Sequence, residues 1–169
     1  MSGKETPATL AATNAGVVFQ THEYSHDPKA ASYGLEAAEA LGIDAMRVFK
    51  TLVTTVERHA RPELVVGIVP VDRQLNLKSL AGAVGVKRAE MAKVADAERT
   101  TGYVAGGISP LGQRKALTTV VDESVYLHDT VFVSAGRRGL EIELRPDDLI
   151  AITAAVVADI ASSDKESTP

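Results

Sequence analysis

The chain lacks cysteine and tryptophan, and only 4% of its 169 residues are aromatic. The absence of cysteine excludes disulfide bonds, cysteine-ligated zinc and a thiol nucleophile supplied by the protein. With so few aromatic residues, the core must be built mainly from Ala, Val, Leu and Ile. No window is apolar for long enough to span a bilayer, and the N-terminus has no apolar signal region. We therefore expect a cytoplasmic protein with no membrane contact.

The chain also lacks an excess of positive charge, since its formal net charge at pH 7 is −4. A nucleic-acid partner would therefore need a local basic patch or help from another protein. Basic pairs at Lys87-Arg88, Arg114-Lys115 and Arg137-Arg138 could form such a patch or be ordinary solvated surface. The four histidines do not fall at metal-ligand spacing, so we expect no metal site.

The length and the order of the sequence patterns predict a single α+β domain, with a curved, barrel-like mixed β-sheet surrounded by helices. We expect this domain over residues 7–160, between tails at residues 1–6 and 161–169. Periodicity and cap residues predict helices at 7–15, 33–41, 77–84 and about 146–160, with a helical turn at 96–99. Strands are expected at 17–22, 49–56, 64–69, 117–121, 130–133 and 140–144.

A glycine-rich loop spans Gly106 to Gly112 and includes Gly107 and Pro110. Glycine lets the backbone approach a ligand closely, and the amides of such a loop can donate to an oxyanion. The loop lacks the Gly-Lys-Ser/Thr of a Walker motif, and it neither follows a long apolar strand nor opens a clear helix, unlike a dinucleotide fingerprint. The alternative is a tight structural turn before the strand at 117.

Lys50 lies in a strand whose two faces are both half apolar, so its side chain is expected against apolar surface. It is either a lysine whose ammonium reaches water at a strand edge, or a desolvated ammonium kept for a carboxyl, carbonyl or phosphate group. Ser109 suggests a triad with His22, His26 or His128. However, nothing resembles the turn that exposes a catalytic serine, and Pro110 follows at once.

Five motifs occur in the order found in YbaK/EbsC proteins, which the chain resembles from about Pro7 to Ile160: residues 22–27, 49–52, 100–103, 106–113 and 133–140. The resemblance implies the fold of the editing domain inserted in bacterial prolyl-tRNA synthetases. It also implies hydrolysis of mischarged Cys-tRNA(Pro) without a cofactor, with the tRNA(Pro) acceptor end as partner. The acidic net charge favours joint action with prolyl-tRNA synthetase.

The same resemblance implies roles for individual residues. Lys50 and Gly107 would be the catalytic residues, Lys50 as an electrostatic anchor for the aminoacyl-adenosine end and Gly107, with Gly106, through backbone contacts to the ester. The nucleophile would be the thiol of the substrate, which the protein positions. Glu141 stands where some members carry aspartate, and Arg137 where relatives often have lysine. The expected substrate-binding residues are Tyr24, Gly106, Ile108, Ser109, Pro110, Gly136, Arg137 and Glu141.

Two alternatives remain open at this point. One is a deacylase of the same fold for another mischarged amino acid, such as Ala-tRNA(Pro). The other is a non-catalytic module that binds tRNA or the synthetase without hydrolysis. Cleavage of a panel of aminoacyl-tRNAs would separate these alternatives from a Cys-tRNA deacylase.

Overall fold

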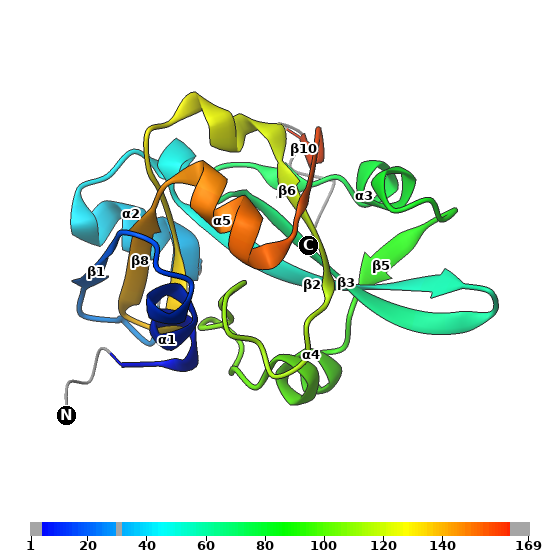
Figure 1. Ribbon diagram of the computed structural model, residues 1–169, viewed down its shortest axis with the longest axis horizontal. Coiled ribbons are helices and arrows are strands. Elements are labelled where there is room, and N and C mark those ends of the chain that lie inside the picture. The colour runs from blue at the N-terminus through cyan, green and yellow to red at the C-terminus, as the bar shows by residue number, and fades with distance from the viewer. Residues whose placement is uncertain (1–4, 30–31, 163–169) are drawn as a thin grey trace.

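The computed structural model describes residues 5–29 and 32–162, and it shows an α+β domain (Figure 1). The α-helices are α1 (Pro7–Asn14), α2 (Tyr33–Leu41), α3 (Leu77–Ala83), α4 (Val94–Thr101) and α5 (Pro146–Thr153). The strands are β1 (Phe19–Glu23), β2 (Phe49–Arg58), β3 (Arg61–Pro70), β4 (Gln74–Leu75), β5 (Ala89–Met91), β6 (Thr118–Asp122), β7 (Val131–Arg137), β8 (Leu140–Leu144), β9 (Val156–Ala158) and β10 (Ala161–Ser162). Short 3-10 helices cover Ala45–Arg47 (η1) and Glu123–Leu127 (η2). No helix within these described ranges is long and apolar enough to cross a membrane.

The two main sheets confirm the expected mixed α+β architecture. One sheet has the order β5-β2-β3-β6-β9, with antiparallel pairs at β5–β2–β3 and parallel pairs at β3–β6–β9. The other has the antiparallel order β1-β8-β7, and β4 pairs with β10 separately. A parallel bridge between Val48 and Phe132 joins the start of β2 to β7. In the part of the chain that the structure describes, the sheets stay open, so the barrel-like curvature does not reach closure.

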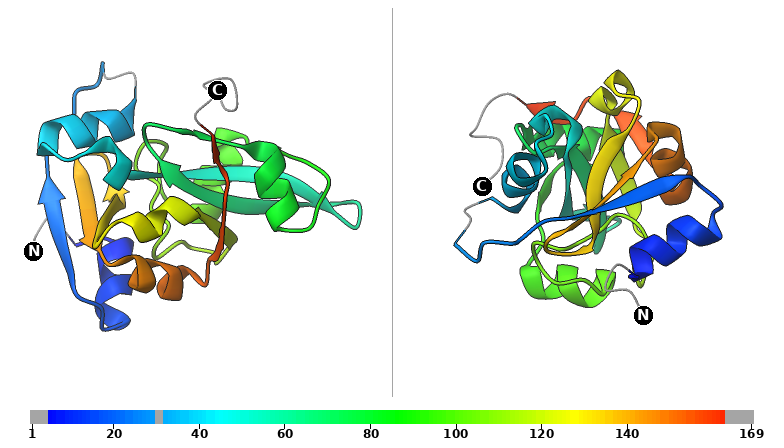
Figure 2. Two further views of the ribbon diagram at one scale, coloured as in Figure 1. Left: turned by 90° about the horizontal axis from the view of Figure 1, so that it is seen from above. Right: turned by 90° about the vertical axis from the view of Figure 1, so that its left-hand side faces the viewer.

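The β2–β3 hairpin is longer than the sequence predicted. Its strands are connected only by His59 and Ala60, which have φ values of 52° and 62°. Two consecutive left-handed residues give the turn twist that matches paired strands. Most of the residues between the strands expected at 49–56 and 64–69 are therefore strand residues. The hairpin end projects beyond the remaining elements in two perpendicular views (Figures 1 and 2).

The helix starts follow the sequence signals closely. Thr6 caps α1 in a capping box with Thr9, and its hydroxyl also donates to the carbonyl of Ala135 at 2.5 Å. Ser32 caps α2, which ends at Gly42 with φ of 67°. The structure also has a full helix, α4, around the helical turn expected at 96–99.

The C-terminal region differs from the prediction. The expected helix to about Ile160 is wrong, because α5 ends at Thr153 and Ala154 adopts φ of 52°. The following residues form β9, which runs parallel to β6. The apolar run 150–157 suits a buried strand as well as a helix, and pairing with β6 decides between them. Residues 161 and 162, assigned above to a tail, pair with β4, while residues 163–169 and 1–4 lie outside the described part.

Asp122 fixes this C-terminal region. Its carboxylate is 1% exposed, and one oxygen accepts hydrogen bonds from the amides of Ile160 and Ala161, both at 2.9 Å. The other oxygen accepts from Ser124. Since amides that donate to a charged acceptor lose a strong bond when it is removed, this side chain holds β10 against the sheet.

We expect Asp122→Ala to lower the free energy of unfolding by about 3 kcal/mol, because two buried amides lose their acceptor. Urea unfolding followed by circular dichroism measures the change. Asp122→Asn is the matched variant: it keeps an acceptor oxygen and should lose less. Equal stability of the wild type and Asp122→Ala would show that these bonds do not anchor the region.

Candidate active site

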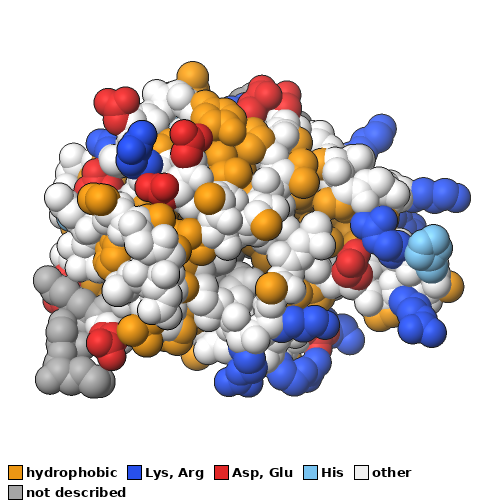
Figure 3. Space-filling view, in the orientation of Figure 1, with side chains coloured by type: hydrophobic (Ala, Val, Ile, Leu, Met, Phe, Trp, Pro, Cys, Tyr) orange, Lys and Arg blue, Asp and Glu red, His pale blue; other side chains and the backbone are white. Residues whose placement is uncertain are grey.

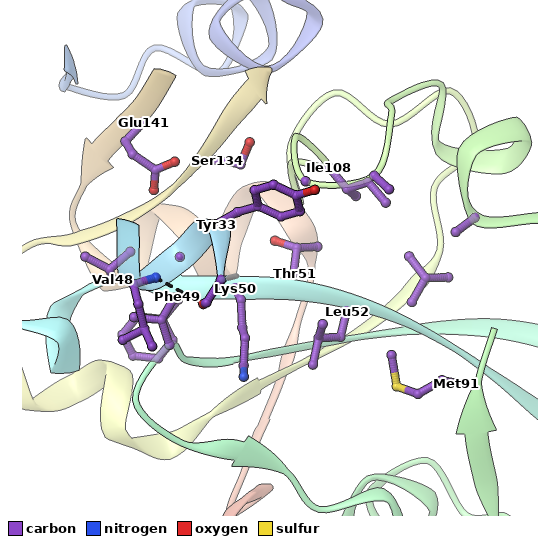
Figure 4. A pocket seen from close by; sticks show the side chains of 18 of the residues that line it. Tyr33, Val48, Phe49, Lys50, Thr51, Leu52, Met91, Ile108, Ser134 and Glu141 are labelled. Atoms are coloured by element: carbon purple, nitrogen blue, oxygen red, sulfur yellow. Dashed lines mark hydrogen bonds between the residues drawn. The ribbon is translucent and has the colours of Figure 1, made fainter. Parts of the chain in front are cut away.

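A cavity of about 530 Å³ lies where the two main sheets meet. Its walls come from the first half of β2, the middle of β7, the start of β8, the first turn of α2 and the glycine loop (Figure 4). β5 pairs with β2 only over Thr54–Val56, so the earlier part of β2 has no such neighbour. The cavity thus follows from the short length of β5. The polar residues on its walls include Tyr24, Lys50, Thr51, Ser134 and Glu141.

Lys50 and Thr51 leave β2 on opposite faces, as the alternation of a strand requires (Figure 4). Lys50 is half-buried, and burial lowers the pKa of its ammonium while the charge of Asp72 opposes this shift. The side chain therefore lies against apolar surface, as its sequence neighbours predicted. The hydroxyl of Thr51 is buried and has no hydrogen-bond partner among the described residues. Such an unpaired buried group is suited to bind a ligand.

Glu141 places a buried carboxyl group on the cavity wall, with 6% of the residue exposed. Burial raises the pKa of this carboxyl to about 8, so the neutral acid predominates at pH 7. In the sheet, Glu141 lies between His22 of β1 and Ser134 of β7. Tyr24 follows β1, and burial together with the nearby Glu141 raises its pKa to about 12. The Tyr24 hydroxyl and the protonated Glu141 carboxyl can therefore donate hydrogen bonds, and Glu141 becomes negatively charged when it loses its proton.

The glycine loop contributes Gly106 and Ile108 to the cavity wall. The amide of Gly107, which was predicted to hold the ester, donates to the carbonyl of Val104 at 2.9 Å. A Cβ on Gly107 would lie 2.8 Å from the Cα of Arg137. Gly107 is therefore required for close packing of the glycine loop against the loop after β7. An amide role for Gly107 would need the bond to Val104 to open.

Two other predicted loop residues stabilise the loop itself. Ser109 is fully buried, and its hydroxyl accepts from the amide of Leu111 at 3.2 Å. Its neighbour Pro110 is also buried, and neither residue is among those that line the cavity. The triad alternative gains no support, because among the described residues the Ser109 hydroxyl forms no hydrogen bond to His22, His26 or His128. His22 bonds Glu143 and His26 bonds Glu36, both at 2.8 Å, and the buried Nε2 of His128 has no hydrogen-bond partner among these residues. Substrate contact by Ser109 or Pro110 stays a prediction.

The loop after β7 is tied to its surroundings by two arginines. Arg137 forms an ion pair with Glu23 at 3.7 Å. Arg138 donates to the carbonyl of Ala105 at 2.8 Å and lies over the ring of Tyr33, 4.3 Å from its centroid. Gly136 has φ of 107° and lies beside the ring of Tyr103, which leaves no room for a Cβ. Neither Gly136 nor Arg137 is among the cavity-lining residues.

Sequence reasoning missed several residues that the fold brings to this site. Tyr33 lines the cavity from the first turn of α2 and contacts Arg138, and Thr51 and Ser134 also line it. Thr51 stood beside Lys50 in one motif, and Ser134 and Arg138 lay in another. The motifs therefore pointed to the right segments. Which side chains of these segments face the cavity depends on the packing of the two sheets, and the sequence alone does not give this packing.

We expect Glu141→Gln to change how stability depends on pH. The folded-state pKa of about 8 lies above the unfolded value, so the folded protein retains a proton that the unfolded chain has lost. The contribution of Glu141 to stability therefore falls as the pH rises from about 4.5 to about 8. Glutamine does not titrate, so the variant should gain stability relative to the wild type over this range, by roughly 4 kcal/mol.

Urea unfolding of both proteins between pH 4.5 and 8.5 measures this difference. Glu143→Gln is a suitable comparison, because ion pairing and hydrogen bonds to Thr130 and His22 lower the pKa of Glu143. That variant should lose stability relative to the wild type as the carboxylate forms at rising pH. Parallel stability curves for Glu141→Gln and the wild type would contradict a raised pKa at Glu141.

Comparison with known proteins agrees with the fold and its motifs. Residues 27–152 match the model of the aminoacyl-tRNA editing domain. The chain is 42% identical over 127 residues to EbsC of Enterococcus faecalis, an inferred Cys-tRNA(Pro)/Cys-tRNA(Cys) deacylase, covering 75% of this chain and 76% of that protein. It is 30% identical over 104 residues to the multifunctional Ser/Thr-tRNA deacylase ProXp-y of Escherichia coli K12, covering 61% and 62%.

A solved structure shares the fold. It belongs to an inferred trans-editing enzyme for prolyl tRNA synthetase, with a TM-score of 0.80 at 23% identity, and the match covers 96% of this chain and 99% of that one. At this level of identity, the likeness bears on the fold. The family match over residues 27–152 includes most of the residues that line the cavity. The chain belongs to the aminoacyl-tRNA editing domain family.

Proposed function

We propose that this protein hydrolyses the ester bond of Cys-tRNA(Pro), releasing cysteine from the mischarged tRNA. The observation that supports this most directly is that Lys50, Thr51, Tyr24 and Glu141 all line one cavity of about 530 Å³. This volume suits an amino acid together with part of a nucleoside. The relative EbsC, 42% identical, supports the same substrate class.

Lys50 and Glu141 would bind oppositely charged parts of the substrate. The Lys50 ammonium would attract a phosphate or ester oxygen of the tRNA terminus, and its half-buried position strengthens this attraction relative to water. Glu141 and Tyr24 would face the amino group of the aminoacyl ester. An ammonium group beside Glu141 would favour its carboxylate form and lower the pKa from about 8.

The chemistry would use a nucleophile from the substrate, since the chain has no cysteine. The cysteinyl sulfur would attack its own ester carbonyl, and the carbon–oxygen bond to the 3′ ribose would break. The thiol proton would pass to the leaving oxygen, through water, and water would then open the resulting thiolactone to cysteine. The protein would contribute position and hydrogen bonds to the developing oxyanion.

A second candidate is a deacylase for Ser-, Thr- or Ala-tRNA. The 30% identity to a multifunctional Ser/Thr-tRNA deacylase favours keeping the hydroxyl amino acids among the tested substrates. Those substrates have no thiol and would need a water molecule or a hydroxyl as nucleophile. The unpaired hydroxyl of Thr51 could then orient that group.

We further propose that tRNA(Pro) reaches the site with the help of prolyl-tRNA synthetase. The net charge of −4 argues against tight binding of tRNA by the whole surface of this protein alone. Joint action would retain the mischarged tRNA near both proteins. An undiminished deacylation rate without the synthetase would contradict this part of the proposal.

A deacylation assay across Cys-, Ser-, Thr-, Ala- and Pro-tRNA(Pro) tests the substrate assignment. We expect rapid release of cysteine and at least a hundredfold slower release of serine, because the hydroxyl is a far weaker nucleophile than the thiol. Release of radiolabelled amino acid measures each rate. Rapid release of alanine would favour a water-dependent deacylase, and no release from any tRNA, even with synthetase present, would favour a non-catalytic module.

We expect Lys50→Ala to reduce deacylation by at least a hundredfold while the protein remains folded, because the variant removes the charge that anchors the tRNA terminus. Thermal unfolding should be unchanged or improved, since burial disfavours the ammonium. Lys78→Ala, an exposed lysine on α3, is the matched control and should retain the wild-type rate. A rate within twofold of wild type for Lys50→Ala would remove Lys50 from the proposed mechanism.

A further inference from the structure

We infer that the acceptor strand of the RNA lies along a basic track that leads from the cavity to the end of the β2–β3 hairpin. The track consists of Lys93, Arg88, Lys87 and Arg61. This inference rests on the proposed function, because it names the surface that holds the substrate of the same site. The ligand of the basic track is a phosphodiester backbone, and the track affects affinity for RNA rather than the choice of amino acid.

Positive charge is concentrated in one segment of the chain. Residues 57–115 contain ten Lys and Arg against six Asp and Glu, whereas all other residues contain eight against sixteen. The net charge of −4 is therefore the sum of a basic segment and an acidic remainder. In the space-filling view, Lys and Arg gather at the hairpin end and below it, over α4 (Figure 3). A local patch of this kind is what an acidic protein needs to bind a polyanion.

The track begins at the cavity itself. Met91, Ala92 and Val94 line the cavity, and the exposed Lys93 lies between them in the chain. The preceding strand, β5, runs along the edge of the main sheet, where Ala89 pairs with Val56 of β2. The exposed Arg88 directly precedes β5. The cavity, β5 and the hairpin are therefore neighbours along this edge of the sheet.

The hairpin end continues this surface past β5. Val56 lies two residues before Arg58, which pairs with Arg61 at the tip. The six Cα–Cα intervals from Lys87 to Lys93 span at most about 22 Å when the chain is extended, and the hairpin adds further length. This reach suits several successive phosphates of a nucleic-acid strand whose terminal nucleotide occupies the cavity.

The four side chains of the track are available to a ligand. Lys87, Arg88, Lys93 and Arg61 are exposed, and in residues 5–29 and 32–162 none of them forms an ion pair. Two nearby arginines differ in this respect. Arg58 pairs with Glu63 at 3.1 Å and Arg99 with Asp96 at 2.6 Å. Glu90 is the exposed acidic residue within β5, and it leaves the track with a net positive charge.

The experiment compares the double variant Lys87→Ala/Arg88→Ala with the wild type. The probe is an acceptor-stem RNA hairpin that ends in CCA and carries no amino acid. Removing two phosphate contacts should weaken binding by on the order of tenfold at low salt and reduce the slope of log K against log[salt] by about 1.5. The KM for Cys-tRNA(Pro) should rise by a similar factor with little change in kcat. Hydrolysis of 3′-cysteinyl-adenosine, which has no phosphate strand, should be unchanged.

Arg145→Ala is the matched control, since Arg145 is exposed but precedes α5, outside the basic segment. It should bind the RNA probe as the wild type does. Wild-type affinity and salt slope in the double variant would overturn the inference. The inference would also be overturned if the double variant bound the RNA probe normally but no longer bound prolyl-tRNA synthetase. That result would assign the track to an acidic protein partner.

The binding arm separates this inference from the proposed function. Wild-type protein that releases no amino acid from any aminoacyl-tRNA would refute the proposed hydrolysis. The basic track would still stand if the double variant lost affinity for the RNA probe. Conversely, normal hydrolysis with an unchanged KM in the double variant would leave the deacylase assignment intact and remove the track.

Discussion

The structure depends on the junction between the start of β2 and β7. There the backbone of Val48 bridges Phe132 and accepts a hydrogen bond from the amide of Val71 at 2.8 Å. This contact holds the two main sheets side by side, and it brings Glu141 of β8 into the same cavity as Lys50 of β2. A site formed between two sheets is held by the packing of both, so its geometry is fixed before a ligand arrives.

Much of the fold could be predicted because its signals are local. Thr6 and Pro7 start a helix, Gly42 ends another, and the hairpin and the half-buried Lys50 follow from strand alternation. The end of α5 could not be predicted, because the strand after it is stabilised by β6, which is distant in sequence. Tyr33, Thr51 and Arg138 were missed for the same physical reason. Their positions depend on contacts between loops and sheets.

The glycine loop illustrates how one sequence pattern can serve structure and function together. Gly107 is needed because the backbone of Arg137 lies too close for any side chain, and its amide already donates to Val104. Ser109 and the Tyr103 hydroxyl, which donates to the Leu111 carbonyl at 2.6 Å, hold the rest of the loop. The pattern was interpreted as a set of ligand-binding amides. In the structure these contacts hold the loop, and Gly106 and Ile108 line the cavity.

Lys50 and Glu141, two ionisable residues of the cavity, share one physical property: burial disfavours the charged form of each. It lowers the pKa of Lys50 and raises that of Glu141. An aminoacyl-tRNA end carries a cationic amine and anionic phosphates, so it would stabilise both charged forms at once. Binding beside Glu141 would release a proton, whereas binding beside Lys50 would retain one. A ligand that carries both charges would stabilise the charged forms of Lys50 and Glu141 together, whereas a simple anion or amine would stabilise only one of them.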